Sequence, residues 1–116
     1  MKFEKNILGE YELRIKNLRF ICDELPEDAE ALARRLADRY FGGGYMELVQ
    51  FLLDVGIAEC YEDFDEKKLK FSLGDPLIDI VNHTITYMDS TLDDDSIITI
   101  TYTGEMAEFL RFSIDG

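Results

Sequence analysis

Residues 26–55 read PEDAEALARRLADRYFGGGYMELVQFLLDV and predict two helices separated by three glycines. Pro26 suits the first position of a helix, and the acids that follow it lie at the positive end of the helix dipole. Apolar residues then recur at helical spacing on one face, at Ala29, Leu32, Ala33, Leu36 and Tyr40. We therefore expect a first helix over residues 26–41, ended by Gly42, Gly43 and Gly44.

The second expected helix begins at Tyr45 and ends at Val55, with Gly56 as its C-terminal cap. Its only polar residues leave one narrow solvent-exposed stripe on an otherwise apolar cylinder; they are Glu47, Gln50 and Asp54. Such a helix is either nearly surrounded by its own domain or partly covered by another chain. A homodimer through this helix is therefore one prediction.

Strands are expected before these helices. Residues 1–22 alternate apolar and charged side chains, which predicts an antiparallel hairpin. Gly9 and Glu10 suit a tight turn between the strands. The alternation slips near Asn17, which favours a bulge or a break there.

Strands are also expected after the helices. Residues 97–102 and 109–114 predict strands because β-branched and aromatic side chains dominate them. Residues 77–88 follow a helix-like start but are rich in β-branched residues, so we favour one strand. Residues 57–64 fit a strand or a loop, and residues 65–73 fit a short helix or a strand.

Segregated helices and strands define the α+β class. We expect an antiparallel sheet, built from the N-terminal hairpin and the C-terminal strands, with two helices packed on one face. The chain has 116 residues, a length typical of one domain, 1–116. It contains no apolar run long enough to span a membrane and no leader-like block, so we expect a cytoplasmic location.

Charge is the first functional clue, because 25 acids against 12 bases give a net charge of −13. Residues 1–22 hold five bases and three acids, whereas residues 71–116 hold nine acids and one base. A field of this sign repels nucleic acid and anionic membranes and attracts basic partners. We therefore expect a basic protein partner and neither nucleic acid nor membrane. Solubility alone also explains an acidic balance.

Two acidic patches are the candidate partner-binding sites. The first has acids around two aromatic residues and comprises Glu59, Tyr61, Glu62, Asp63, Phe64, Asp65 and Glu66. The aromatic side chains would supply burial and cation–π contact, and the acids would steer a basic partner. The alternative is a solvated loop whose aromatic side chains point into the core. The second patch comprises Asp93, Asp94 and Asp95.

Signals for metal, cofactor or catalysis are weak. Asp89, Thr91, Asp93 and Asp95 alternate oxygen ligands, but the glycine and glutamate of a calcium loop are missing. The single His83 leaves too few ligands for zinc, and no serine lies in a G-x-S-x-G motif. The residues therefore favour no metal, no cofactor and no catalytic residue. Cys22 and Cys60 are expected to be buried reduced thiols, with a disulfide as the alternative.

The C-terminal third carries a short series of turn and strand motifs: Leu73-Gly74-x-Pro76, Tyr87-x-Asp89, Asp94-Asp95-x-Ile97-Ile98 and Ile114-Asp115-Gly116. This region resembles a loose group of small acidic bacterial domains of unknown function, some of which are similar to immunity or inhibitor proteins of toxin systems. That group often has a histidine before the strand beginning at Ile97, where this chain has Ser96. The resemblance implies a strand over residues 77–88 and no catalytic activity.

Together these features favour a non-enzymatic binding protein of the immunity or inhibitor type, which would cap a basic partner such as a nuclease toxin. A homo-oligomeric accessory or structural domain is the alternative. A metal-dependent hydrolase is the least supported of the three, because the sequence offers only scattered carboxylates for it.

Overall fold

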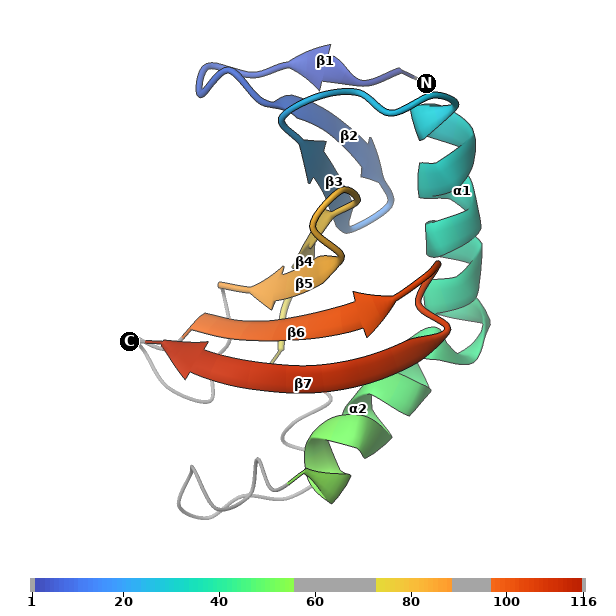
Figure 1. Cartoon of the computed structure of the whole chain (residues 1–116), viewed down its shortest axis with the longest axis vertical. Helices are drawn as coiled ribbons and strands as arrows, with labels where there is room; N and C mark the ends of the chain where they lie inside the picture. The colour runs from blue at the N-terminus through green and yellow to red at the C-terminus, as the bar shows by residue number, and fades with distance from the viewer. Residues whose placement is uncertain (1, 56–72, 89–96, 116) are drawn as a thin grey trace.

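The structure, a computed structural model, describes residues 2–55, 73–88 and 97–115. Its seven described strands form one sheet in chain order, from β1 to β7. A helical segment runs along one side of this strongly twisted sheet (Figure 1). The α+β class and the largely antiparallel sheet predicted from the sequence are therefore confirmed, in a sheet larger than expected.

The N-terminal strands are β1 (Glu4–Lys5), β2 (Tyr11–Ile15) and β3 (Leu18–Cys22), paired antiparallel. The break expected near Asn17 is confirmed, because β2 ends at Ile15 and β3 begins at Leu18. Ile15 pairs with Leu18, so Lys16 and Asn17 form a two-residue hairpin turn. Lys16 has a φ of 54°, the positive value that such tight hairpin turns require.

Residues 77–88 form strand and not helix, as expected, but they contribute two strands where one was expected: β4 (Pro76–Asp79) and β5 (Thr84–Tyr87). The Asp79 side chain makes the turn between them. Its Oδ1 accepts the N–H groups of Val81 at 3.0 Å and Asn82 at 2.9 Å. An aspartate that accepts hydrogen bonds from backbone N–H groups two and three residues ahead stabilises a turn. The β-branched residues on both sides of this turn favour strand, so the sequence pattern does not indicate where one strand ends and the next begins.

One strand pair is parallel, which corrects the fully antiparallel expectation. β3 pairs with β4, with Phe20 opposite Ile78, and this pair joins the N-terminal hairpin to the C-terminal strands. Parallel neighbours need a long crossover connection, and the helical segment lies within the connection that this pair requires. The sheet ends with β6 (Ile97–Thr103) and β7 (Glu108–Asp115), which confirm the two strands expected there.

The helical segment is continuous, so the prediction of two separate helices is wrong. It comprises α1 (Ala29–Arg39), a π-helical turn η1 (Tyr40–Gly44) and α2 (Tyr45–Asp54). Gly42 and Gly43 alone leave helical backbone angles inside η1, which kinks the segment without ending it. Arg39 braces the kink, because it pairs with Glu47 of α2 and donates from Nε to the Met106 carbonyl at 3.1 Å.

The three glycines differ in their backbone angles and in the space around them, so replacing each with alanine should lower the stability by different amounts. Gly43 has a φ of 128°, so Gly43→Ala should cost about 1–3 kcal/mol of backbone strain. A Cβ on Gly44 would lie 2.7 Å from the Arg39 carbonyl oxygen, so Gly44→Ala should cost about 1–3 kcal/mol through overpacking. Gly42 has neither constraint. Urea unfolding of Gly42→Ala should therefore show no loss, and a loss matching the other two would contradict this explanation.

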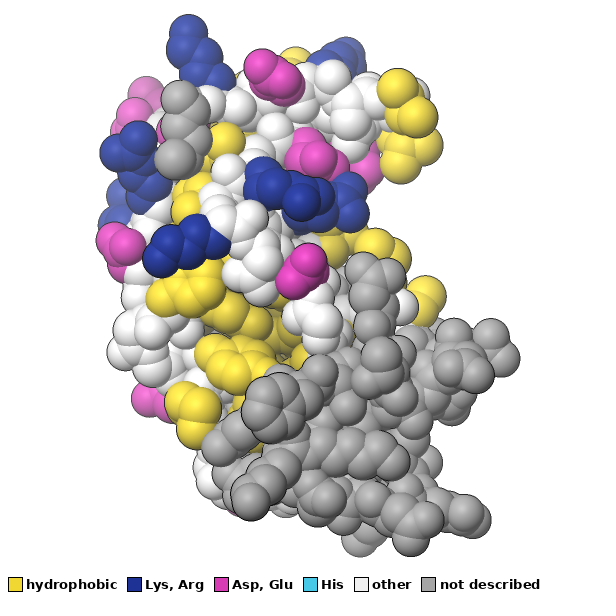
Figure 2. Space-filling view, turned by 180° about the vertical axis from the view of Figure 1, so that it is seen from behind, with side chains coloured by type: hydrophobic (Ala, Val, Ile, Leu, Met, Phe, Trp, Pro, Cys, Tyr) yellow, Lys and Arg dark blue, Asp and Glu magenta, His cyan; other side chains and the backbone are white. Residues whose placement is uncertain are grey.

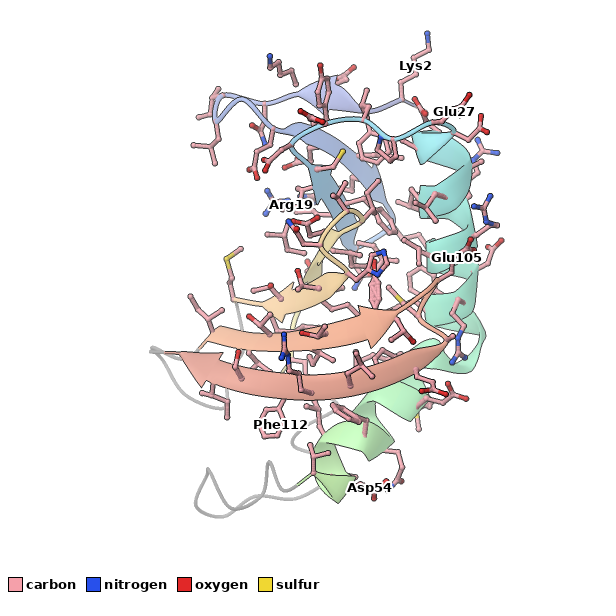
Figure 3. The ribbon with its side chains drawn as sticks, in the orientation of Figure 1. Lys2, Arg19, Glu27, Asp54, Glu105 and Phe112 are labelled. Carbon is pink, nitrogen blue, oxygen red and sulfur yellow. The ribbon has the colours of Figure 1, made fainter. Side chains whose placement is uncertain are left out.

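The core lies between the helical segment and the sheet face that it covers. Leu18, Phe20, Ile78, Ile85 and Ile98 are fully buried on the sheet, and Ala33, Leu36, Leu48 and Leu52 on the helical segment. An ion pair also links the turn between β6 and β7 to α1. Glu105 of this turn lies beside α1 (Figure 3), and its carboxylate accepts two hydrogen bonds from Arg35.

The second expected helix, α2, packs mainly against its own domain, which is one of the two alternatives for this helix. Leu48, Val49 and Leu52 of α2 are buried, and the Phe51 ring packs 6.0 Å from the ring of Phe109 on β7. Met46 and Val55 remain 51% and 45% exposed at the two ends of the helix. Most of its apolar surface is thus covered by the same chain.

Candidate functional site

A cavity of about 470 Å³ opens beside the helical kink. It lies where the kink meets the β2–β3 turn and the residues that lead into β4. Its described lining is Asn17, Tyr40, Phe41, Gly43, Tyr45, Met46, Gly74 and Asp75. This volume is typical of sites that bind small molecules or side chains of a partner.

One wall of the cavity is aromatic. The Tyr40 ring lies 5.5 Å from Phe41, edge to face, and 5.4 Å from Tyr45. Phe41 is 45% exposed and Met46 is 51% exposed, so large apolar groups stand at the cavity mouth. Aromatic rings and a flexible thioether adapt well to an incoming side chain. This arrangement can therefore receive an apolar or cationic side chain.

The rim is polar and carries both signs of charge. Asn17 Nδ2 donates to Asp75 Oδ1 at 3.2 Å, which links the β2–β3 turn to the start of β4. Lys16 Nζ lies 4.7 Å from the centre of the Phe41 ring, a cation–π contact within the chain. Figure 2 shows one face of the molecule, where hydrophobic side chains gather beneath Lys and Arg side chains.

A pair of tyrosine hydroxyls supports the cavity from the core side. The Tyr40 and Tyr87 hydroxyl oxygens are 2.7 Å apart, and Tyr87 is completely buried on β5. Burial raises the pKa of both phenols, so both stay protonated over the physiological range. The hydrogen bond links Tyr40 of the cavity wall to Tyr87 on β5.

This pair predicts a loss of stability in alkali. Tyrosines in the unfolded chain ionise at about pH 10, whereas the folded pair stays neutral at that pH. The contribution of the pair to the free energy of unfolding is therefore complete below about pH 10 and is progressively lost above it. Urea unfolding at about pH 9 and about pH 11 should show the decline. The Tyr40→Phe/Tyr87→Phe double variant should decline less steeply, and an equal slope would show that the pair does not cause it.

The residues proposed from the sequence as partner-binding all lie outside the described residues. They are Glu59, Tyr61, Glu62, Asp63, Phe64, Asp65, Glu66, Asp93, Asp94 and Asp95. The structure does describe where their segments join the fold. Because Pro76 pairs with Tyr87 and Tyr87 with Ile98, the chain enters β4, leaves β5 and enters β6 at one end of the sheet. Asp75 of the cavity rim lies at that same end.

His83 and Cys22 have structural surroundings. The His83 ring stacks on Tyr102 at 5.1 Å, and its carbonyl accepts the Tyr102 N–H at 3.0 Å. Cys22 is a buried free thiol whose pKa is raised by burial to about 11, so it is protonated and unreactive at neutral pH. Cys60 lies outside the described residues. Within the described ranges, no three His, Cys, Asp or Glu side chains are grouped as metal ligands.

The glycine run predicts only the end of a helix, so the sequence pattern does not indicate the cavity residues around it. The available signal was the placement of Tyr40, Phe41, Tyr45 and Met46 on both sides of those glycines. π-helical turns inside helices are frequently found at functional sites.

Comparison with protein families, with curated proteins and with solved structures finds no match for this chain. In the part of the chain that the structure describes, no helix has the length and apolar character needed to cross a membrane.

Proposed function

We propose that this chain is a non-enzymatic acidic binding protein of the immunity or inhibitor type, which caps a basic protein partner. The observation that carries the proposal is the open aromatic cavity at the helical kink, with Asp75 on its rim. A partner would insert a lysine or arginine side chain there.

The chemistry of the cavity suits a long cationic side chain. Aromatic faces attract ammonium and guanidinium groups, and the aliphatic stem of such a side chain would pack on Met46 and Phe41. The contact between Lys16 and Phe41 is an example of the same interaction inside this chain. Asp75 would supply a carboxylate for the cationic group.

The net charge of −13 supports fast, salt-sensitive association with a basic partner. The acidic patches Glu59–Glu66 and Asp93–Asp95 remain predictions for this steering role. Inhibition would follow from occlusion, because a rigid surface seated over a partner's basic site excludes that partner's own ligands.

Capture from the native host's lysate tests the proposal. The wild-type protein and the Phe41→Ser variant should be used as parallel baits, each washed at low and at high salt. We expect one stoichiometric basic protein on the wild-type bait, weakened by salt and much reduced on Phe41→Ser. The Leu110→Ser variant is the matched control, because Leu110 is 55% exposed on β7 and does not line the cavity. An acidic partner, or equal capture by all three baits, would refute the proposal.

A further inference from the structure

The β1–β2 turn presents two large aliphatic side chains to solvent. Ile7 is fully exposed and Leu8 is 78% exposed. Adjacent aliphatic residues with this exposure carry a cost in water that burial against another surface would remove. We call Ile7 and Leu8 the apolar tip.

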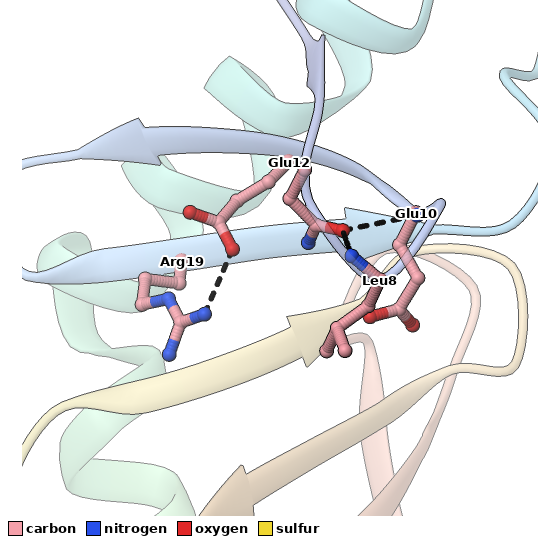
Figure 4. A network of polar contacts seen from close by, with 5 residues as sticks. Leu8, Glu10, Glu12 and Arg19 are labelled. Carbon is pink, nitrogen blue, oxygen red and sulfur yellow. Dashed lines mark hydrogen bonds and ion pairs between the residues drawn. The ribbon is translucent and has the colours of Figure 1, made fainter.

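The backbone that carries the apolar tip is held in one conformation. Asn6 Oδ1 accepts the N–H groups of Leu8 at 2.9 Å and Glu10 at 3.1 Å, and Gly9 completes the turn with a φ of 83° (Figure 4). The Asn6 N–H donates to the Glu10 carbonyl at 2.7 Å. A pre-organised turn loses little conformational entropy when it binds, so the apolar tip is built for insertion into a pocket.

The charge distribution indicates what the apolar tip would meet. Residues 1–22 carry a net charge of +2, and residues 23–116 carry −15. The N-terminal hairpin of one copy and the remainder of another copy therefore have opposite charges, which favours this orientation of two copies over others.

We propose that the apolar tip of one copy inserts into the kink cavity of a second copy. Removing one leucine side chain from a protein core can leave a cavity of about 150 Å³, so about 470 Å³ has room for both tip side chains. Met46 and Phe41 at the mouth supply apolar contact. Lys5 beside the tip and Asp75 on the rim have opposite charges, as do Glu10 and Lys16.

Insertion of this kind is a head-to-tail contact, because the two surfaces differ. Such contacts build rings or open chains of subunits unless two copies exchange tips reciprocally. The apolar tip would then occupy the cavity that the proposed function assigns to a basic partner. Self-association and partner binding would exclude each other, yet self-association can be measured on the purified chain alone.

Sedimentation velocity over a concentration series tests the inference through complementation. The wild type should associate as its concentration rises. The tip variant Ile7→Ser/Leu8→Ser and the cavity variant Phe41→Ser/Met46→Ser should each associate at least about 10-fold more weakly. A mixture of the two variants should form a one-to-one dimer, because it contains one intact tip and one intact cavity. Leu110→Ser should associate like the wild type.

Circular dichroism should show that every variant is folded, since all the substituted side chains are exposed. If the cavity variant is not folded, Met46→Ser alone replaces it. A wild type that stays monomeric at every concentration would overturn the inference. So would a tip variant that associates as strongly as the wild type, or a mixture of the two variants that remains monomeric.

Discussion

Replacing Leu52 with alanine should lower the free energy of unfolding by about 2–5 kcal/mol. Leu52 is fully buried on α2, among core residues contributed by both the helical segment and the sheet. Its removal would leave a cavity that the neighbouring side chains can fill only in part. Urea unfolding followed by circular dichroism measures the loss.

Val55→Ala is the matched control for Leu52→Ala. Val55 lies one turn further along the chain, directly after α2, and is 45% exposed, so its truncation should change the free energy of unfolding by less than about 0.5 kcal/mol. Equal effects at the two positions would mean that α2 does not face the core as described.

The largest expected effect on binding comes from Phe41→Ala/Met46→Ala. Both side chains stand at the cavity mouth, and aromatic anchors at the centre of an interface commonly contribute about 2 kcal/mol or more each. We therefore expect the affinity for the captured partner to fall by about 100-fold or more, mainly through faster dissociation. Surface plasmon resonance would separate the two rates.

Leu110→Ala controls for a general loss of exposed apolar surface and should leave the affinity unchanged. Stability should be nearly constant in both variants, because the substituted side chains are about half exposed. Unchanged dissociation of the Phe41→Ala/Met46→Ala variant would show that the partner binds elsewhere, with the acidic patches at 59–66 and 93–95 as the next sites to test.

Sequence periodicity predicts much of the fold, because buried residues recur about every 3.6 residues along a helix and every second residue along a strand. Ala33 and Leu36 are buried on the predicted face of the first helix, and Ile98 and Ile100 alternate on a predicted strand. Helix continuity across the glycines escaped prediction, since intrinsic propensity is outweighed by tertiary packing. The parallel β3–β4 pair was not predicted, because it depends on contacts between segments that are distant in the sequence. The Asp79 turn was not predicted, because the β-branched residues on both sides of it favour one continuous strand.

The cavity could not be predicted from local patterns, because three separate segments line it: residues 40–46, Asn17, and Gly74 with Asp75. Each segment alone resembles a turn or a helix end. The acidic patches, by contrast, are obvious in the sequence, and they stay predictions because they lie outside the described residues. Net charge can be calculated from the composition, whereas a cavity can be recognised only from the three-dimensional arrangement of the segments that line it.

The most direct measurement is the affinity of the captured partner for two single-charge variants. Asp75→Asn changes a residue that lines the cavity, and Lys16→Gln changes the cation that contacts the lining residue Phe41. If the cavity receives a basic side chain, loss of the Lys16 cation should tighten binding and loss of the Asp75 carboxylate should weaken it, with both differences shrinking at high salt. Unchanged affinity in both variants, or changes in the reverse directions, would contradict a basic partner at this cavity.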